Sequence, residues 1–199
     1  MTISLTPLKL EERVQRALRE DVTIVPYDAA WPELFRQEAE HLRAYLPPRL
    51  IRRIEHFGST AVPGLAAKPI IDMLVEVTSL RAARAEIAPI LEAQGYDYFW
   101  RPTIGDDVLP WYAFFIRRDQ SGTRTHHIHM MTSRPVFQVH WERLLFRDYL
   151  IDHPTVARQY EVLKKGLAAS HPNDRLDYTT GKTEFILRIM AWAKQKGDW

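Results

Sequence analysis

The feature that most constrains the fold is the segment PIIDMLVEV at residues 69–77, which is apolar apart from Asp72 and Glu76. Strands that are buried on both faces read as near-continuous hydrophobic runs, so we expect an inner strand of a sheet here. An aspartate inside such a strand indicates a site that holds a metal ion and a phosphate. The alternative is an edge strand whose aspartate faces water.

The composition is that of an ordinary globular chain with one core, because 46% of the 199 residues are hydrophobic and 26% are charged. A formal net charge of +2 gives no clear indication of nucleic-acid binding. The absence of cysteine excludes disulfides, thiolate nucleophiles and cysteine-based zinc sites. We find no apolar run of about 18 residues and no signal-peptide pattern, so we expect a cytoplasmic protein without a membrane partner. The sequence leaves the oligomeric state open.

Hydrophobic periodicity and turn residues predict one domain over residues 1–199. A helical extension over residues 1–21, beginning at Thr6 and Pro7, precedes a mixed-sheet core over residues 22–133 and a helical segment over residues 134–199. Predicted strands cover residues 22–27, 52–57, 69–77, 96–100, 111–118 and 126–131. Predicted helices cover residues 28–46 and 79–94, the second bent at Pro89, and three more begin near residues 133, 154 and 180. This order is typical of an α/β or α+β domain.

A turn of small residues, Gly58, Ser59 and Thr60, follows the predicted strand at residues 52–57. Glycine permits close approach of the backbone, and hydroxyl and N–H groups in such a turn can cradle a phosphate. Asp72 could then hold Mg²⁺ against that phosphate, and Lys68 could offset its negative charge. An ordinary turn followed by a solvent-facing aspartate is an equal alternative.

Three histidines lie within four residues in the predicted strand THHIHMM. His127 and His129 point to one face of the strand and His126 to the other. Two imidazoles on one face can share a metal ion or contact a phosphate, and we favour this interpretation over a pair of half-exposed histidines. Arg124, just before them, is either an anion contact or a solvated side chain.

Two basic residues in the predicted helical segment, Arg147 and Lys182, could also point inward to a phosphate. For a single basic residue on a helix, the solvated alternative is the more common one.

Four blocks, HFGSTAVPGLAAKPIIDMLVEV, RTHHIHMM, FRDYLIDHP and YTTGKTEFI, together resemble the GrpB family over about residues 22–195. The blocks stand in the family's order and spacing. The resemblance implies a nucleotidyltransferase-like mixed sheet in which a Gly-Ser turn precedes a strand with acidic metal ligands. Gly58, Ser59 and Asp72 fall on this pattern. The resemblance also implies a nucleotide or another phosphorylated small molecule as ligand, with Mg²⁺ or Mn²⁺ as cofactor.

The sequence departs from the transferase pattern at Leu74, where a second carboxylate would complete the metal site. Glu76 shares the strand face, but it lies about 13 Å from Asp72 by strand rise. His127 and His129 could complete an Asp-His-His site, whose donors suit Mn²⁺, Fe²⁺ or Zn²⁺ better than Mg²⁺. Three hypotheses follow: a transferase of unknown acceptor, a catalytically degenerate nucleotide-binding or accessory module, and a metal-dependent enzyme that uses the Asp-His-His site.

Overall fold

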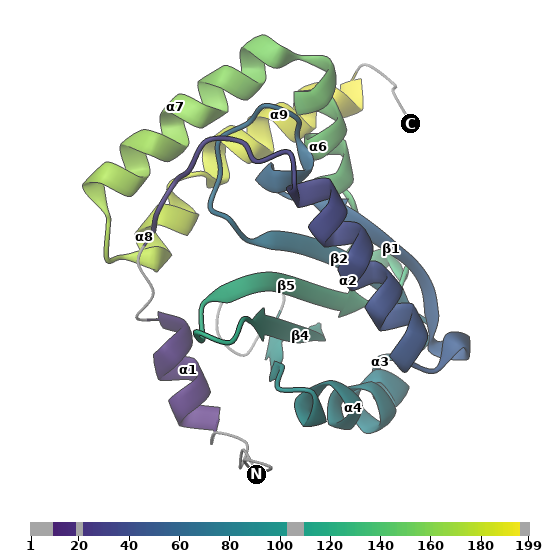
Figure 1. The fold of residues 1–199 in the computed structure, drawn as a ribbon. Helices are drawn as coiled ribbons and strands as arrows, with labels where there is room; N and C mark the ends of the chain where they lie inside the picture. The colour runs from purple at the N-terminus through teal and green to yellow at the C-terminus, as the bar shows by residue number, and fades with distance from the viewer. Residues whose placement is uncertain (1–9, 19–21, 103–109, 196–199) are drawn as a thin grey trace.

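A computed structural model describes residues 10–18, 22–102 and 110–195 of the chain. Within these residues the centre is a five-stranded mixed sheet with the order β1-β2-β5-β4-β3 (Figure 1). The strands are β1 (Ile51–Phe57), β2 (Ile71–Val77), β3 (Asp97–Pro102), β4 (Trp111–Arg118) and β5 (Arg124–Met131). The predicted mixed sheet flanked by helices is confirmed.

The pairing of β2 with β5 decides where the candidate site forms. These two strands run parallel, and all other neighbours in the sheet run antiparallel. The parallel register places Asp72 opposite His127 and Leu74 opposite His129. Because β2 has a neighbour on each side, the alternative of an edge strand for Asp72 is wrong.

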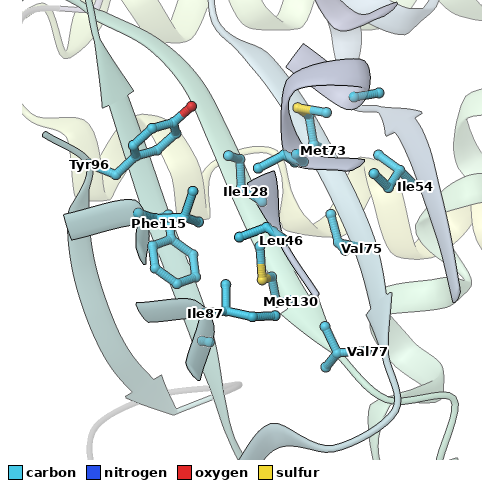
Figure 2. Close-up of a cluster of buried hydrophobic side chains, with 14 of the residues drawn as sticks. Leu46, Ile54, Met73, Val75, Val77, Ile87, Tyr96, Phe115, Ile128 and Met130 are labelled. Atoms are coloured by element: carbon cyan, nitrogen blue, oxygen red, sulfur yellow. The ribbon is translucent and has the colours of Figure 1, made fainter. Parts of the chain in front are cut away.

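One face of the sheet is covered by α2 (Trp31–Tyr45), α3 (Leu80–Ala82) and α4 (Ala88–Ala93). Figure 2 shows the buried side chains of this layer, including Met73 and Val75 from β2 and Phe115 from β4. Successive side chains of a strand point to opposite faces. Asp72 and Leu74 therefore face the other layer.

The second face is covered by the C-terminal helices, which Figure 1 shows gathered on one side of the sheet. They are α5 (Gln138–Trp141), α6 (Arg143–Asp152), α7 (Pro154–Ser170), α8 (Arg175–Thr180) and α9 (Thr183–Gln195). Leu74 packs in this layer with Phe137 and Trp141, while Val62 and Leu65 pack with side chains of α6, α7 and α9. The face that carries Asp72 is thus enclosed by helices.

The N-terminal helix α1 (Leu10–Leu18) lies within the predicted extension, whose expected start at Thr6 and Pro7 falls outside the described residues. Arg13 of α1 forms an ion pair with Glu92 at 2.8 Å. None of the helices in the described ranges is both long and apolar enough to cross a membrane.

The predicted strand at residues 22–27 is wrong, because the structure has only an isolated bridge there, between Val25 and Ala67. Each of these two residues donates its N–H to the carbonyl of the other, at 2.9 and 3.0 Å. Pro26 follows directly and has no N–H to continue a ladder.

Two helical predictions also need correction. The segment at residues 79–94 consists of α3, a π-helical turn (Ala83–Ile87) and α4. Pro89 cannot donate a backbone hydrogen bond, which accounts for the irregular turn before it. Helix α8 was not predicted from the sequence, although Asp174 caps it by accepting hydrogen bonds from the N–H groups of Leu176 and Asp177.

Candidate functional site

The centre of the candidate site is a hydrogen bond between β2 and β5. His127 Nδ1 lies 2.8 Å from Asp72 Oδ1, and His127 Nε2 lies 3.0 Å from Arg124 Nη1. A guanidinium only donates, so Nε2 accepts and Nδ1 carries the proton that it donates to Asp72. Arg124 therefore fixes the tautomer of His127. Arg124 was predicted as an anion contact, and its described partner within the site is this histidine.

His129 lies beside this pair, on the same face of β5. Its Nδ1 is 3.2 Å from the Tyr112 hydroxyl, and its ring packs edge-on against Phe57. Asp72, His127 and His129 each offer one ligand atom, and these atoms all lie within 4.8 Å of one another. The three residues predicted as metal ligands are thus brought together, while His126 belongs to the opposite face.

The donor set is one carboxylate oxygen and two imidazole nitrogens, which fits Mn²⁺, Fe²⁺ or Zn²⁺ better than Mg²⁺. The 2.8 Å between Asp72 Oδ1 and His127 Nδ1 is also the spacing of two adjacent ligands around one ion with bonds of about 2.1 Å. A bound ion would take the place of the Nδ1 proton of His127, and the neutral imidazole would then carry its proton on Nε2, which could no longer accept from Arg124.

The protonation states also suit metal binding. Burial raises the pKa of Asp72, but the hydrogen bond and the positive charges around it outweigh this effect and hold that pKa well below its usual range. Burial lowers the pKa of His127 to about 4 in spite of Asp72, and it lowers the pKa of His129 well below its ordinary value. At neutral pH the carboxylate is charged and both imidazoles are neutral, as metal ligation requires.

The Gly58 turn lies directly against the carboxylate. Gly58 has φ 75° and ψ −172°, and a Cβ added there would lie 2.5 Å from Asp72 Oδ2. This close approach explains why glycine stands there. Ser59, next in the turn, shares a hydrogen bond with Tyr160 of α7. The Thr60 hydroxyl serves the turn itself, because it donates to the carbonyl of Ile70 at 3.4 Å.

Two lysines approach the site around one aromatic ring. The ammonium of Lys68 lies 4.9 Å, and that of Lys182 4.2 Å, from the ring centre of Tyr178. Burial, together with the positive charges nearby, lowers the pKa of Lys68 to about 7 and that of Lys182 to about 8, although Asp72 opposes both shifts. The two lysines, 114 positions apart in the printed sequence, thus form one positively charged group beside Asp72.

Arg147 makes its described contacts away from this group. Its Nη1 donates to the carbonyl of His56 at 2.7 Å, and its Nε donates to Asp148 at 2.7 Å. The first of these bonds connects α6 to β1, and the second lies within α6. Its predicted role as a phosphate ligand stays a prediction.

Four residues that adjoin the site were not predicted from the sequence: Tyr112, Arg143, Tyr160 and Tyr178. Asp72 interacts electrostatically with three of them, and Tyr112 contacts His129. The signal available for Tyr178 was its place in the block that contains Lys182. The other three have no local signal, because their positions depend on how helices pack on the sheet.

The two surface hollows described in the structure lie elsewhere. One lies between residues 63–65 and helices α6 and α7, and the other between α2, residues 94–96 and the end of β4. Asp72 and the two histidines line neither, so the candidate site is identified by its side-chain chemistry alone.

The chain is similar to known proteins in both sequence and structure. The UPF0157 protein YqkA of Bacillus subtilis is 40% identical over 175 residues, or 87% of this chain and 48% of YqkA, so the chain spans about half the length of that relative. The UPF0157 protein PA4798 of Pseudomonas aeruginosa is 42% identical over 185 residues, covering 92% of this chain and 72% of that protein.

A solved structure agrees with these sequence matches. The crystal structure of conserved protein GrpB from Enterococcus faecalis has a TM-score of 0.74 and 35% identity, and it covers 87% of this chain and 98% of its own. The family described as GrpB protein matches residues 21–191, which confirms the resemblance inferred from the four sequence blocks. The chain therefore belongs to the GrpB protein family.

Proposed function

We propose that this GrpB protein binds a nucleotide or another phosphorylated small molecule together with a divalent metal ion held by Asp72, His127 and His129. The observation that carries the proposal is that the ligand atoms of these three residues lie within 4.8 Å of one another. A bound ion would supply positive charge against a phosphate oxygen. The mixed oxygen and nitrogen donors favour Mn²⁺ or another transition metal over Mg²⁺.

The phosphate part of the proposal is supported by the positive charge around Asp72. Lys68 interacts electrostatically with Lys182, Arg124 and Arg175, and all three lower its pKa. Burying several cations together is unfavourable unless negative charge offsets them. A phosphate next to Ser59 would receive N–H hydrogen bonds from the turn and charge from both lysines.

A reaction at this site would differ from nucleotidyl transfer that uses two metal-bound carboxylates. Leu74 is fully buried in the apolar layer below the C-terminal helices. Glu76 is engaged by Arg53 at 3.1 Å. A metal-dependent enzyme with the Asp-His-His site is our first candidate, and Leu74 favours a nucleotide-binding module without turnover as the second.

The test of the metal site uses the full chain incubated with Mn²⁺, Zn²⁺ or Mg²⁺ and then desalted, with bound metal measured by mass spectrometry. We expect about one equivalent of Mn²⁺ or Zn²⁺ in the wild type and a loss of most of it in Asp72→Asn and His129→Gln. His171→Gln, at a histidine outside the site, is the matched control. Equal metal content in all four proteins would refute the metal site.

The phosphate ligand is tested by thermal shift with ATP in the presence and absence of Mn²⁺. We expect stabilisation that depends on Lys182 and is lost in Lys182→Gln. Transfer of label from γ- and α-labelled ATP then separates the two candidates: release or transfer of label indicates the enzyme, and binding without label transfer indicates the module. No stabilisation by ATP, with or without metal, would count against a nucleotide ligand.

A further inference from the structure

A second group of basic residues lies at the His129 end of the site and has no role in the proposal above. Arg101 of β3 is exposed, and its guanidinium lies 5.8 Å from the ring centre of Tyr112 and 5.3 Å from that of Phe114. Arg143 is the first residue of α6. Both arginines interact electrostatically with His129.

Neither Arg101 nor Arg143 forms an ion pair with a carboxylate among the residues that the structure describes. The acidic group with which Arg143 interacts at a distance is Asp72, whose charge already attracts Lys68. A partly buried guanidinium group such as that of Arg143 normally has a carboxylate or phosphate partner, because its charge is costly to bury alone. Arg143 instead has the positive charge of Arg101 nearby.

His140 supplies a second, independent observation. Its side chain is 1% exposed, and within the described residues neither ring nitrogen has a hydrogen-bond partner. Its ring lies 5.1 Å from that of Tyr112, and it interacts electrostatically with Arg143 and Arg101. Buried polar groups are nearly always hydrogen-bonded, so an unpaired imidazole N–H that packs against the same tyrosine as the Arg101 guanidinium is a donor available to an anion.

We propose that Arg101, Arg143 and His140 form a second anion subsite beside His129, which binds a carboxylate or phosphate group of a second substrate. This second subsite rests on the proposed function in one respect, because it adjoins the same Asp72 cluster and so places the second substrate next to the phosphorylated ligand. The exposed Arg101 is at its entrance. Lys68 and Lys182, around Tyr178, form the first anion subsite.

The test follows backbone amide resonances of the ¹⁵N-labelled full chain during titration with inorganic phosphate. The amides of Tyr112 and His140 report on the second subsite, and those of Ser59 and Lys182 report on the first. We expect both sets to shift in the wild type. Arg101→Gln and Arg143→Gln should each raise by about tenfold the phosphate concentration needed to shift the Tyr112 and His140 amides, since a charge-assisted hydrogen bond is lost.

Controls separate this inference from the proposed function. Arg81→Gln, at an exposed arginine of α3, should leave both sets unchanged. Lys182→Gln should weaken the response of Ser59 and spare that of His140. If His140 responds to phosphate while Ser59 never does, the second subsite stands and the proposed phosphate ligand fails.

The inference is overturned if the amides of Tyr112 and His140 do not respond in the wild type, or if they respond in both arginine variants as strongly as in the wild type. Arg101 is exposed, so Arg101→Gln keeps the test valid even if Arg143→Gln perturbs the fold, which the same spectra would reveal. A parallel titration with acetate identifies the anion: an equal or stronger response at His140 indicates a carboxylate group, and a weaker one a phosphate group.

Discussion

Replacing Gly58 by alanine should damage both the stability of the protein and its metal site. Gly58 has φ 75° and ψ −172°, a region that is essentially restricted to glycine and costs other residues about 1–3 kcal/mol. The added Cβ would also lie 2.5 Å from Asp72 Oδ2 and 3.1 Å from Asp72 Cβ. Asp72 must therefore move, and losing its hydrogen bond with His127 adds about 1.5–3 kcal/mol.

Together these effects should lower the free energy of unfolding by roughly 2.5–6 kcal/mol, measured by urea denaturation. Gly64→Ala is the matched control, because Gly64 also has a positive φ, 77°, but nothing lies within 4 Å of a Cβ there. The difference between the two variants measures the contact with Asp72 together with any effect of the extended ψ of Gly58. We also expect Gly58→Ala to bind Mn²⁺ more weakly than Gly64→Ala does.

A double-mutant cycle tests the cause. In an Asp72→Ala background the contact with Oδ2 is gone, so the additional cost of Gly58→Ala should fall towards that of Gly64→Ala. If Gly58→Ala costs no more than Gly64→Ala in the wild-type background, the turn does not depend on close packing against Asp72, and our account of the turn is refuted.

Two buried charged groups lead to further predictions. Burial lowers the pKa of Lys164 to about 7. Above that pH the unfolded chain binds more protons than the folded chain, so the free energy of unfolding rises with pH. Urea denaturation between pH 7 and 10 should show a smaller rise in Lys164→Met than in the wild type, and an unchanged rise would contradict this prediction. Glu38 is fully buried and accepts hydrogen bonds from Tyr96 and Arg117. Glu38→Ala should lower the free energy of unfolding by about 3 kcal/mol, whereas Glu40→Ala, at an exposed glutamate, should lower it by less than about 1 kcal/mol. Equal losses in the two variants would show that the buried network is unimportant.

The wrongly predicted strand and the missed helix each have a physical reason. Residues 22–27 have the β-branched composition of a strand, but a strand also needs a partner, and the structure offers Val25 only a single bridge with Ala67. The short helix α8 has too few residues to show a hydrophobic period, so only its cap at Asp174 could have indicated it.

Local sequence determined much of the candidate site. The apolar run around Asp72 predicted an inner strand, and the two-residue period of β5 predicted that His127 and His129 share a face. The turn at Gly58 was predicted from glycine and hydroxyl residues that follow one another in the chain. Each of these inferences depends on neighbours within a few positions, where backbone geometry alone fixes the direction of side chains.

Tertiary structure alone decided which of these pieces meet. The parallel pairing of β2 with β5 places Asp72 opposite His127, and no feature within either strand specifies that partner or its register. The packing of the C-terminal helices brings Lys182 to Lys68, and Arg143 to His129. Such contacts depend on the burial of apolar surface across the whole chain, so the sequence by itself determined the chemical groups of the site, and the fold determined their arrangement.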